Sequence, residues 1–115
     1  MNFVSSTPRN GATGVSLNPR IVLTFTLNVV DDTVWANNRN QIRLFRNSNS
    51  IAINVTRSTV FDDRHNIYVR PVNSLRPSTD YRLVIQPGLT GNNGNTLGET
   101  VTIRFRTKAG VRPEE

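Results

Sequence analysis

Apolar and polar residues alternate along short stretches of the chain, and clusters of turn-forming residues separate these stretches. In residues 20–27, Ile21, Leu23 and Phe25 fall on one side of an extended backbone, while two threonines fall on the other. This period of two is that of a β-strand with one buried face. We therefore expect residues 20–27 to form a central strand with Phe25 in the core.

Six further stretches have the same extended character and are separated by turns that contain proline, glycine or asparagine. They are residues 3–7, 41–46, 51–57, 65–71, 81–86 and 100–107. The turn at residues 47–50 is expected to join two of them as a hairpin, and residues 31–35 to form one helical turn with an aspartate as N-cap. Because no longer helical pattern is present, the sequence predicts an all-β protein, an antiparallel β-sandwich of about seven strands.

The length of 115 residues is that of one domain, since most domains hold roughly 100–150 residues. We expect the domain to span residues 1–108 and residues 109–115 to form a tail or linker. Cysteine is absent, which excludes disulfides, thiolate catalysis and cysteine-ligated metals. No apolar stretch approaches the ~20 residues that a membrane-spanning helix requires.

The chain is strongly basic. Basic residues outnumber acidic residues 14 to 8, which gives a formal net charge of +6, and 13 of the 14 basic residues are arginine. Such a surface attracts polyanions, but long-range attraction of this kind is non-specific and fixes neither the fold nor the partner. The charge alone therefore identifies no ligand.

Four motifs follow one another along the chain. They are residues 8–19 (PRNGATGVSLNP) ahead of the strand at 20–27, the valine and turn at 30–34, the corner at 75–81 (LRPSTDY), and Gly94-Asn95 ahead of Phe105 and Thr107. Together they resemble the bacterial Ig-like domain found in S-layer proteins and in other secreted or wall-attached bacterial proteins. The resemblance covers about residues 4–108 and implies an Ig-like or fibronectin III-like sandwich.

The corner at residues 75–81 is similar to that of fibronectin type III modules. Pro77 is expected to stiffen the turn, and Tyr81 to pack its ring inward and bond its hydroxyl to the backbone near Leu75. Phe105 is expected to contribute to the same core. The family often has an acidic residue where this chain has Gly91, so the resemblance implies no cation site in that loop.

The resemblance also implies a function. Domains of this kind act as non-catalytic spacers, lattice elements or adhesion modules, often in tandem, and no cofactor or active site is implied. The expected location is extracellular or at the cell surface. The expected partners are neighbouring domains of a larger surface protein or an anionic polymer of the cell wall or extracellular space.

A small hydrolase built on the single histidine is the least favoured alternative. His65 has Ser58 and the pair Asp62-Asp63 near it in the sequence, but a turn beside a strand accounts for all of them. The pairs Asp31-Asp32 and Asp62-Asp63 lack the alternating oxygen ligands of a calcium loop. Trp35 is either a platform for a sugar ring or, as we favour, a lid on the core. We therefore expect no catalytic and no metal-binding residues.

Five residues share the outer face predicted for one sheet. In an Ig-like strand order, alternation places on this face Arg43, Phe45, Arg82, Arg104 and Arg106. Such a basic surface suits an anionic glycan, teichoic acid, nucleic acid or an acidic neighbouring domain, although nucleic acid is not the expected partner. The simpler interpretation, which we favour, is that the arginine stems cover a solvent-facing sheet and protect its edges.

Overall fold

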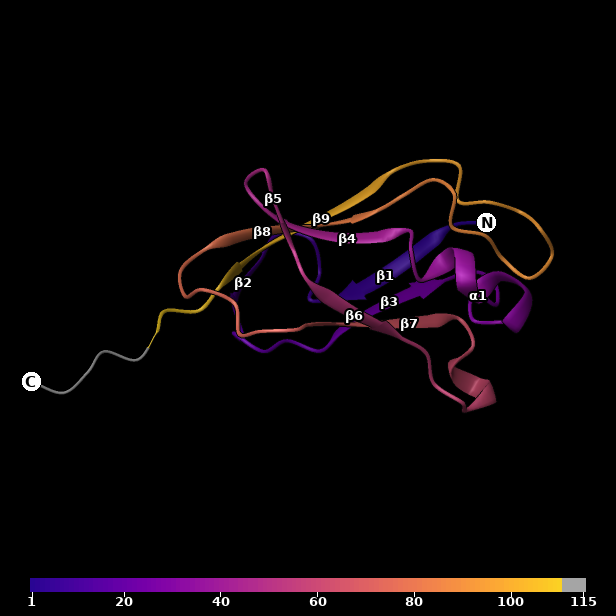
Figure 1. Ribbon diagram of the computed structural model, residues 1–115, viewed down its shortest axis with the longest axis horizontal. Coiled ribbons are helices and arrows are strands. Elements are labelled where there is room, and N and C mark those ends of the chain that lie inside the picture. The colour runs from indigo at the N-terminus through magenta and orange to yellow at the C-terminus, as the bar shows by residue number, and fades with distance from the viewer. Residues whose placement is uncertain (111–115) are drawn as a thin grey trace, which may run out of the picture.

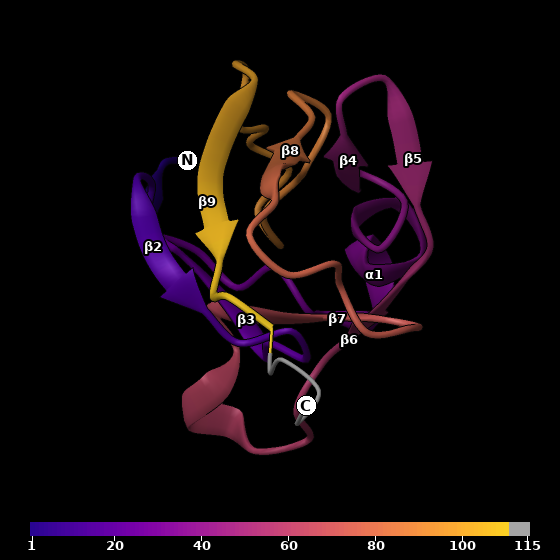
Figure 2. The same ribbon diagram turned by 90° about the vertical axis from the view of Figure 1, so that its left-hand side faces the viewer.

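Two β-sheets stack face to face in the computed structural model, which describes residues 1–110 (Figure 1). One sheet contains, in spatial order, β1 (Phe3–Thr7), β3 (Ile21–Phe25), β7 (Asn66–Pro71) and β6 (Ile53–Thr56). The other contains β2 (Ala12–Val15), β9 (Val101–Thr107), β8 (Asp80–Ile85), β4 (Ile42–Arg46) and β5 (Asn49–Ile51). Figure 2 shows the five-stranded sheet as one layer, with β3, β7 and β6 beneath it. This arrangement confirms the predicted β-sandwich.

Alternate side chains from both sheets fill the space between them. Ile21, Leu23 and Phe25 of β3 are 1 %, 0 % and 1 % exposed, as the alternation predicts. From the facing sheet, Leu44 of β4 and Leu83 of β8 are fully buried. Burying one such side chain stabilises the fold by about 1.5–3 kcal/mol relative to leaving it in water. The period of two in the sequence therefore supplies the apolar faces that hold the two sheets together.

The stretch expected as one strand at residues 51–57 is two strands in different sheets. β5 pairs with β4, whereas β6 pairs with β7, and Ala52 separates them. Ile51 and Ile53, on either side of the crossing, are both half-buried. The alternation therefore continues through the crossing, and the sequence gives no sign of it.

β2 lies in a segment that the sequence predicts to be a turn. Gly11 and Gly14 adopt positive φ angles of 86° and 65°, a conformation that glycine reaches without strain. Val15 is the only residue of this strand that is buried. β2 pairs in parallel with β9, so the five-stranded sheet is mixed rather than wholly antiparallel.

A helix, α1 (Asp32–Asn38), lies at the end of the sandwich where β1 begins (Figure 1). It is longer than the single turn expected. Asp31 is its N-cap and accepts a hydrogen bond from the Thr33 N–H at 3.0 Å, which confirms the predicted aspartate cap. Trp35 is half-buried and packs against the core, as expected for a lid. A 3₁₀ helix at Phe61–Asp63 precedes β7.

The first and last strands reach opposite ends of the sandwich. β1 begins near α1, whereas β9 ends at the far end of the molecule (Figure 1). There the Ser78 N–H donates to the Lys108 carbonyl at 2.9 Å, which ties the end of β9 to the corner ahead of β8. Residues 111–115 of the expected tail lie outside the described residues. Within residues 1–110, no helix has the length and apolar character needed to cross a membrane.

Candidate functional site

The outer face of the five-stranded sheet carries the predicted basic surface. β4, β8 and β9 are neighbours in this sheet, and Phe45, Arg82 and Arg104 lie in one row across them. Arg82 is directly opposite Phe45 on one side and Arg104 on the other. Arg106 lies on the same face of β9, opposite Asp80. The sequence thus predicts correctly that these side chains come from neighbouring strands.

A groove of about 400 Å³ lies on this face. Four residues of the predicted set line it, namely Phe45, Arg82, Arg104 and Arg106, and residues 11–13 at the start of β2 form one wall. Arg43 does not line this groove. It borders a separate cleft of about 610 Å³ beside β5 and β6, together with Arg39 and Arg70. The groove therefore brings together three of the four predicted arginines, while Arg43 lies on the same outer face, opposite Val84 of β8, but outside the groove.

Arg82 is held in place by contacts toward β4. Its guanidinium lies over the Phe45 ring, 4.6 Å from the ring centroid, and donates a hydrogen bond to the Asn47 carbonyl at 2.6 Å. A guanidinium over an aromatic face contributes about 0.5–1 kcal/mol at an exposed site. These two contacts fix the position of Arg82 before any ligand arrives.

Arg104 is held differently, through its backbone alone. Its N–H donates to Asn10 Oδ1 at 2.8 Å, and its carbonyl accepts from the Gly11 N–H at 2.7 Å, which anchors the wall of the groove. Its guanidinium makes no hydrogen bond and no ion pair with any residue of the described part of the chain. Arg106, in contrast, pairs with Asp80 at 3.3 Å; both side chains are at least 49 % exposed, so this pair adds little stability.

The corner ahead of β8 is locked by two side chains. Tyr81 is buried, and its hydroxyl accepts a hydrogen bond from the Arg76 N–H at 2.9 Å. Thr107 is also buried; its hydroxyl donates to the Arg76 carbonyl at 2.6 Å and accepts from the Thr79 N–H at 2.9 Å. Pro77 lies exposed between these contacts, and the Phe105 ring stacks on Tyr81 at 5.8 Å. The corner at residues 75–81 and the end of β9 at Phe105 and Thr107 are therefore in direct contact.

Asn38, at the end of α1, organises the opposite end of the sandwich. It is fully buried, and its side-chain nitrogen donates to the carbonyls of Val29 at 2.8 Å and Thr90 at 2.7 Å. Its side-chain oxygen accepts from the Thr90 N–H at 2.9 Å. This role was not predicted from the sequence, in which Asn38 is one of 15 asparagines. Its burial could have been predicted from its position one helical turn after Val34, which places it on the inward face of the helix.

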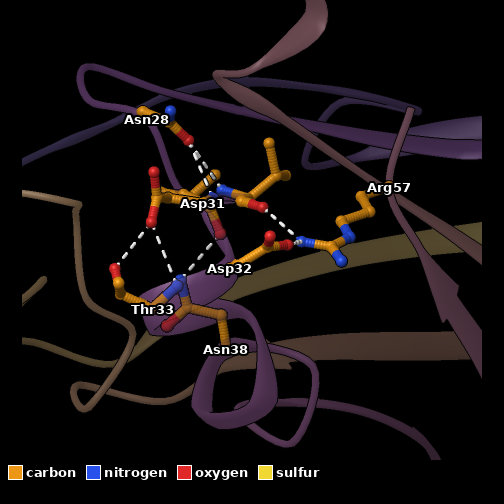
Figure 3. A network of polar contacts seen from close by, with 8 residues as sticks. Asn28, Asp31, Asp32, Thr33, Asn38 and Arg57 are labelled. Carbon is orange, nitrogen blue, oxygen red and sulfur yellow. Dashed lines mark hydrogen bonds and ion pairs between the residues drawn. The ribbon is translucent and has the colours of Figure 1, made fainter. Parts of the chain in front are cut away.

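The first aspartate pair already has protein partners (Figure 3). Asp31 accepts a hydrogen bond from the Thr33 hydroxyl at 2.7 Å. This bond lowers the pKa of the Asp31 carboxyl most, and the bond from the Thr33 N–H lowers it further. Desolvation raises this pKa, and the charge of Arg57 lowers it by a smaller amount. Asp32 pairs with Arg57 at 2.7 Å, and Arg57 also donates to the Val30 carbonyl at 2.7 Å. These contacts fasten α1 to the chain that follows β6.

The histidine and the second aspartate pair do not form a site in residues 1–110. The His65 carbonyl accepts a hydrogen bond from the Phe25 N–H at 2.9 Å, so the backbone of this residue contributes to the sheet. The Ser58 hydroxyl accepts from the Val60 N–H at 3.0 Å and so serves the local turn. No group of three or more histidine, aspartate or glutamate residues lies close enough in this range to hold a metal ion.

Two sheets in this strand order, with a tyrosine bonded across the corner, define an immunoglobulin-like β-sandwich. A family model described as the bacterial Ig-like domain matches residues 1–107. The chain therefore belongs to the bacterial Ig-like domain family, which confirms the resemblance seen in the sequence. No curated protein matches it.

Solved structures with this fold include domains 1–6 of the surface layer protein SbsC, at 18 % identity and a TM-score of 0.63. They also include L,D-transpeptidase 3 from Mycobacterium tuberculosis, at 10 % identity and a TM-score of 0.61. The aligned region covers 96 % and 93 % of this chain, but only 14 % and 37 % of those chains. At such identities the likeness shows a shared fold, and this chain corresponds to a minor part of each structure.

Proposed function

We propose that this protein is a non-catalytic, extracellular module that serves as a structural spacer or adhesion domain of a bacterial surface or secreted protein. Its family and its likeness to part of a surface layer protein support this role. The likeness to part of a transpeptidase is compatible with it, because the matched segment covers 37 % of that enzyme. Its natural partners would then be neighbouring domains, and its location the cell surface or the extracellular space.

The observation that carries the spacer role is the placement of the first and last strands at opposite ends of the sandwich (Figure 1). Domains joined to these two ends would be held apart by the full length of β1 and β9. A tensile load between them would run along the strands. Hydrogen bonds perpendicular to such a load resist it together, whereas bonds at a strand end that peels open break one after another.

The parallel pairing of β2 with β9 is the part of the fold best placed to resist this load. The Gly11 N–H donates to the Arg104 carbonyl at 2.7 Å, and the Lys108 N–H donates to the Val15 carbonyl at 2.9 Å. Pulling the two ends of the chain apart would shear both bonds at once. A spacer under tension is therefore expected to unfold abruptly, in one step.

Single-molecule force spectroscopy on the full chain, held by its two ends, tests this role. Lys108→Pro removes the N–H that bonds to Val15 and should lower the unfolding force, while Lys108→Ala, which keeps that N–H, should not. A wild-type domain that extends gradually at low force, or equal forces for the two variants, would contradict a load-bearing spacer.

The groove favours a second candidate function, binding of an anionic polymer through the arginine-rich sheet face. The sequence-predicted residues Arg82, Arg104 and Arg106 line it. Replacing these three and Arg43 by serine should abolish salt-sensitive retention on heparin without unfolding the domain. The matched control replaces four arginines that do not line the groove, Arg9, Arg20, Arg64 and Arg76, and so removes the same charge. Equal retention of both variants would exclude a specific basic face.

A further inference from the structure

We propose that Arg82 and Arg104 form a clamp for a single oxyanion, a carboxylate or phosphate, carried by an acidic sugar residue that lies in the groove. This inference rests on the anionic-polymer function proposed above and names the chemical group that it would recognise. It concerns two side chains within the wider basic face.

The first argument is an uncompensated like-charge pair. Arg82 and Arg104 are directly opposite each other on β8 and β9. Like charges on directly opposed residues of an antiparallel pair destabilise the sheet, and side chains as long as arginine lessen this repulsion by spreading their charged ends apart. The nearby carboxylate of Asp80 pairs with Arg106 instead. An anion between the two guanidiniums would turn this repulsion into two attractive contacts.

The second argument is that the two side chains leave room for the anion. The Phe45 ring and the Asn47 carbonyl hold the Arg82 guanidinium on the β4 side, away from Arg104. The donors of the Arg104 guanidinium have no partner within residues 1–110. A guanidinium presents its donors in a planar fork that matches two oxygens of a carboxylate or phosphate. The site is thus preorganised on one side and open on the other.

The third argument concerns the rest of the ligand. A volume of about 400 Å³ falls within the range of small-molecule sites, which suits a short stretch of sugar residues. Ala12 and the edge of Phe45 offer apolar contact to a ring, while Thr13 and Asp80 offer partners for sugar hydroxyls. The Asp80 carboxylate would repel a second closely spaced phosphate. An acidic glycan fits this mixture of groups better than a polyphosphate does.

Nucleic acid fits less well for a related reason. Single strands bind proteins by stacking their bases on exposed aromatic rings. Phe45 is the aromatic side chain of the predicted face, and the Arg82 guanidinium already covers one of its faces. No second ring in the groove is exposed, since Tyr81 and Phe105 are buried.

Calorimetric titration of the full chain with three probes tests the clamp. The probes are a galacturonic acid oligosaccharide, glucose 1-phosphate and a single-stranded DNA oligonucleotide. We expect binding of the first or second, with DNA weaker by at least about tenfold; the two acidic probes distinguish carboxylate from phosphate. Arg104→Gln and Arg82→Gln should each weaken binding by about tenfold or more, because a charge-assisted pair of hydrogen bonds is lost. Arg64→Gln, the matched control, should change it by less than about threefold, because the Arg64 guanidinium lies over the Phe61 ring and does not line the groove.

Stability gives an independent readout. In the absence of ligand, Arg104→Gln removes the like-charge repulsion and should raise the Tm by about 1–4 °C. A lowered Tm, or DNA binding as tight as that of the acidic glycans, would overturn the clamp. Heparin retention that is lost in the four-arginine variant but unchanged in Arg104→Gln would also overturn it, and would leave the broader polymer-binding function standing. Absence of wild-type retention on heparin would remove that broader function as well.

Discussion

The hydroxyl oxygen of Tyr81 lies 2.9 Å from the backbone nitrogen of Arg76 and accepts its hydrogen bond. Tyr81 is the second residue of β8 and is buried in the core, so this bond fixes the chain at the point where it enters the five-stranded sheet. Thr107 at the end of β9 bonds the Arg76 carbonyl at 2.6 Å. The backbone N–H and carbonyl of Arg76 are thus both hydrogen-bonded to side chains of the neighbouring strands β8 and β9.

Removing only the hydroxyl of Tyr81 should therefore weaken the domain. Tyr81→Phe keeps the ring in the core but leaves the Arg76 N–H without its partner, and the free energy of unfolding in urea should fall by about 1–3 kcal/mol. Tyr68→Phe is the matched control, because the Tyr68 hydroxyl makes no hydrogen bond within residues 1–110. That control should stay within about 0.5 kcal/mol of wild type. Similar losses in both variants would show that the corner bond is unimportant.

The strands and the corner could be predicted because their signals are local. A period of two needs only neighbouring residues, and the spacing from Pro77 to Tyr81 is contained in one turn. The crossing at Ala52 could not be predicted, since the alternation runs through it unbroken. The parallel pairing of β2 with β9 joins residues about ninety positions apart, and nothing in the turn-like composition of β2 indicates it.

The basic face could be predicted in part for the same reason. Alternation puts Arg82 and Arg104 on one side of their strands, and the strand order then makes them neighbours. The length of β5 cannot be predicted from the alternation. β5 ends opposite Leu44, so Arg43 has no β5 partner and borders the cleft beside β5 and β6. The partners of a charged side chain, such as Asn47 for Arg82, depend on the loop that the sheet brings near.

Replacing Asn38 by an apolar residue should be among the costlier changes in this chain. Asn38→Leu leaves the carbonyls of Val29 and Thr90 and the Thr90 N–H without their partner in a buried site. The free energy of unfolding should fall by about 2–4 kcal/mol. Asn40→Ala is the control, because the exposed Asn40 makes one local bond to Ala36, and it should cost less than about 1 kcal/mol. Equal losses would show that the buried amide is not a structural tie.

The N-cap of α1 should make stability depend on acid. Hydrogen bonds from the Thr33 hydroxyl and N–H lower the pKa of Asp31 in the folded state, so the folded protein prefers the carboxylate. This contribution is present above the unfolded-state pKa of about 3.9 and is lost as the pH falls through the lower folded-state pKa. Asp31→Asn keeps a capping oxygen but does not titrate, so its Tm should fall less than that of wild type on acidification below about pH 4. Parallel Tm profiles for the two proteins would contradict this.

Gly91 has no room for a side chain. A Cβ at this position would lie 2.6 Å from Leu27 Cδ1 and 2.9 Å from Leu27 Cβ. Gly91→Ala should therefore destabilise the domain by about 1–3 kcal/mol in urea unfolding, because Leu27 Cβ cannot move without its backbone. In a Leu27→Ala background the loss should shrink, although the Cβ of residue 27 would still be close to the new methyl. Gly88→Ala is the control and should cost little, because its new methyl meets only the Gln41 side chain. An undiminished loss in the Leu27→Ala background would place the strain in the loop backbone rather than in this contact.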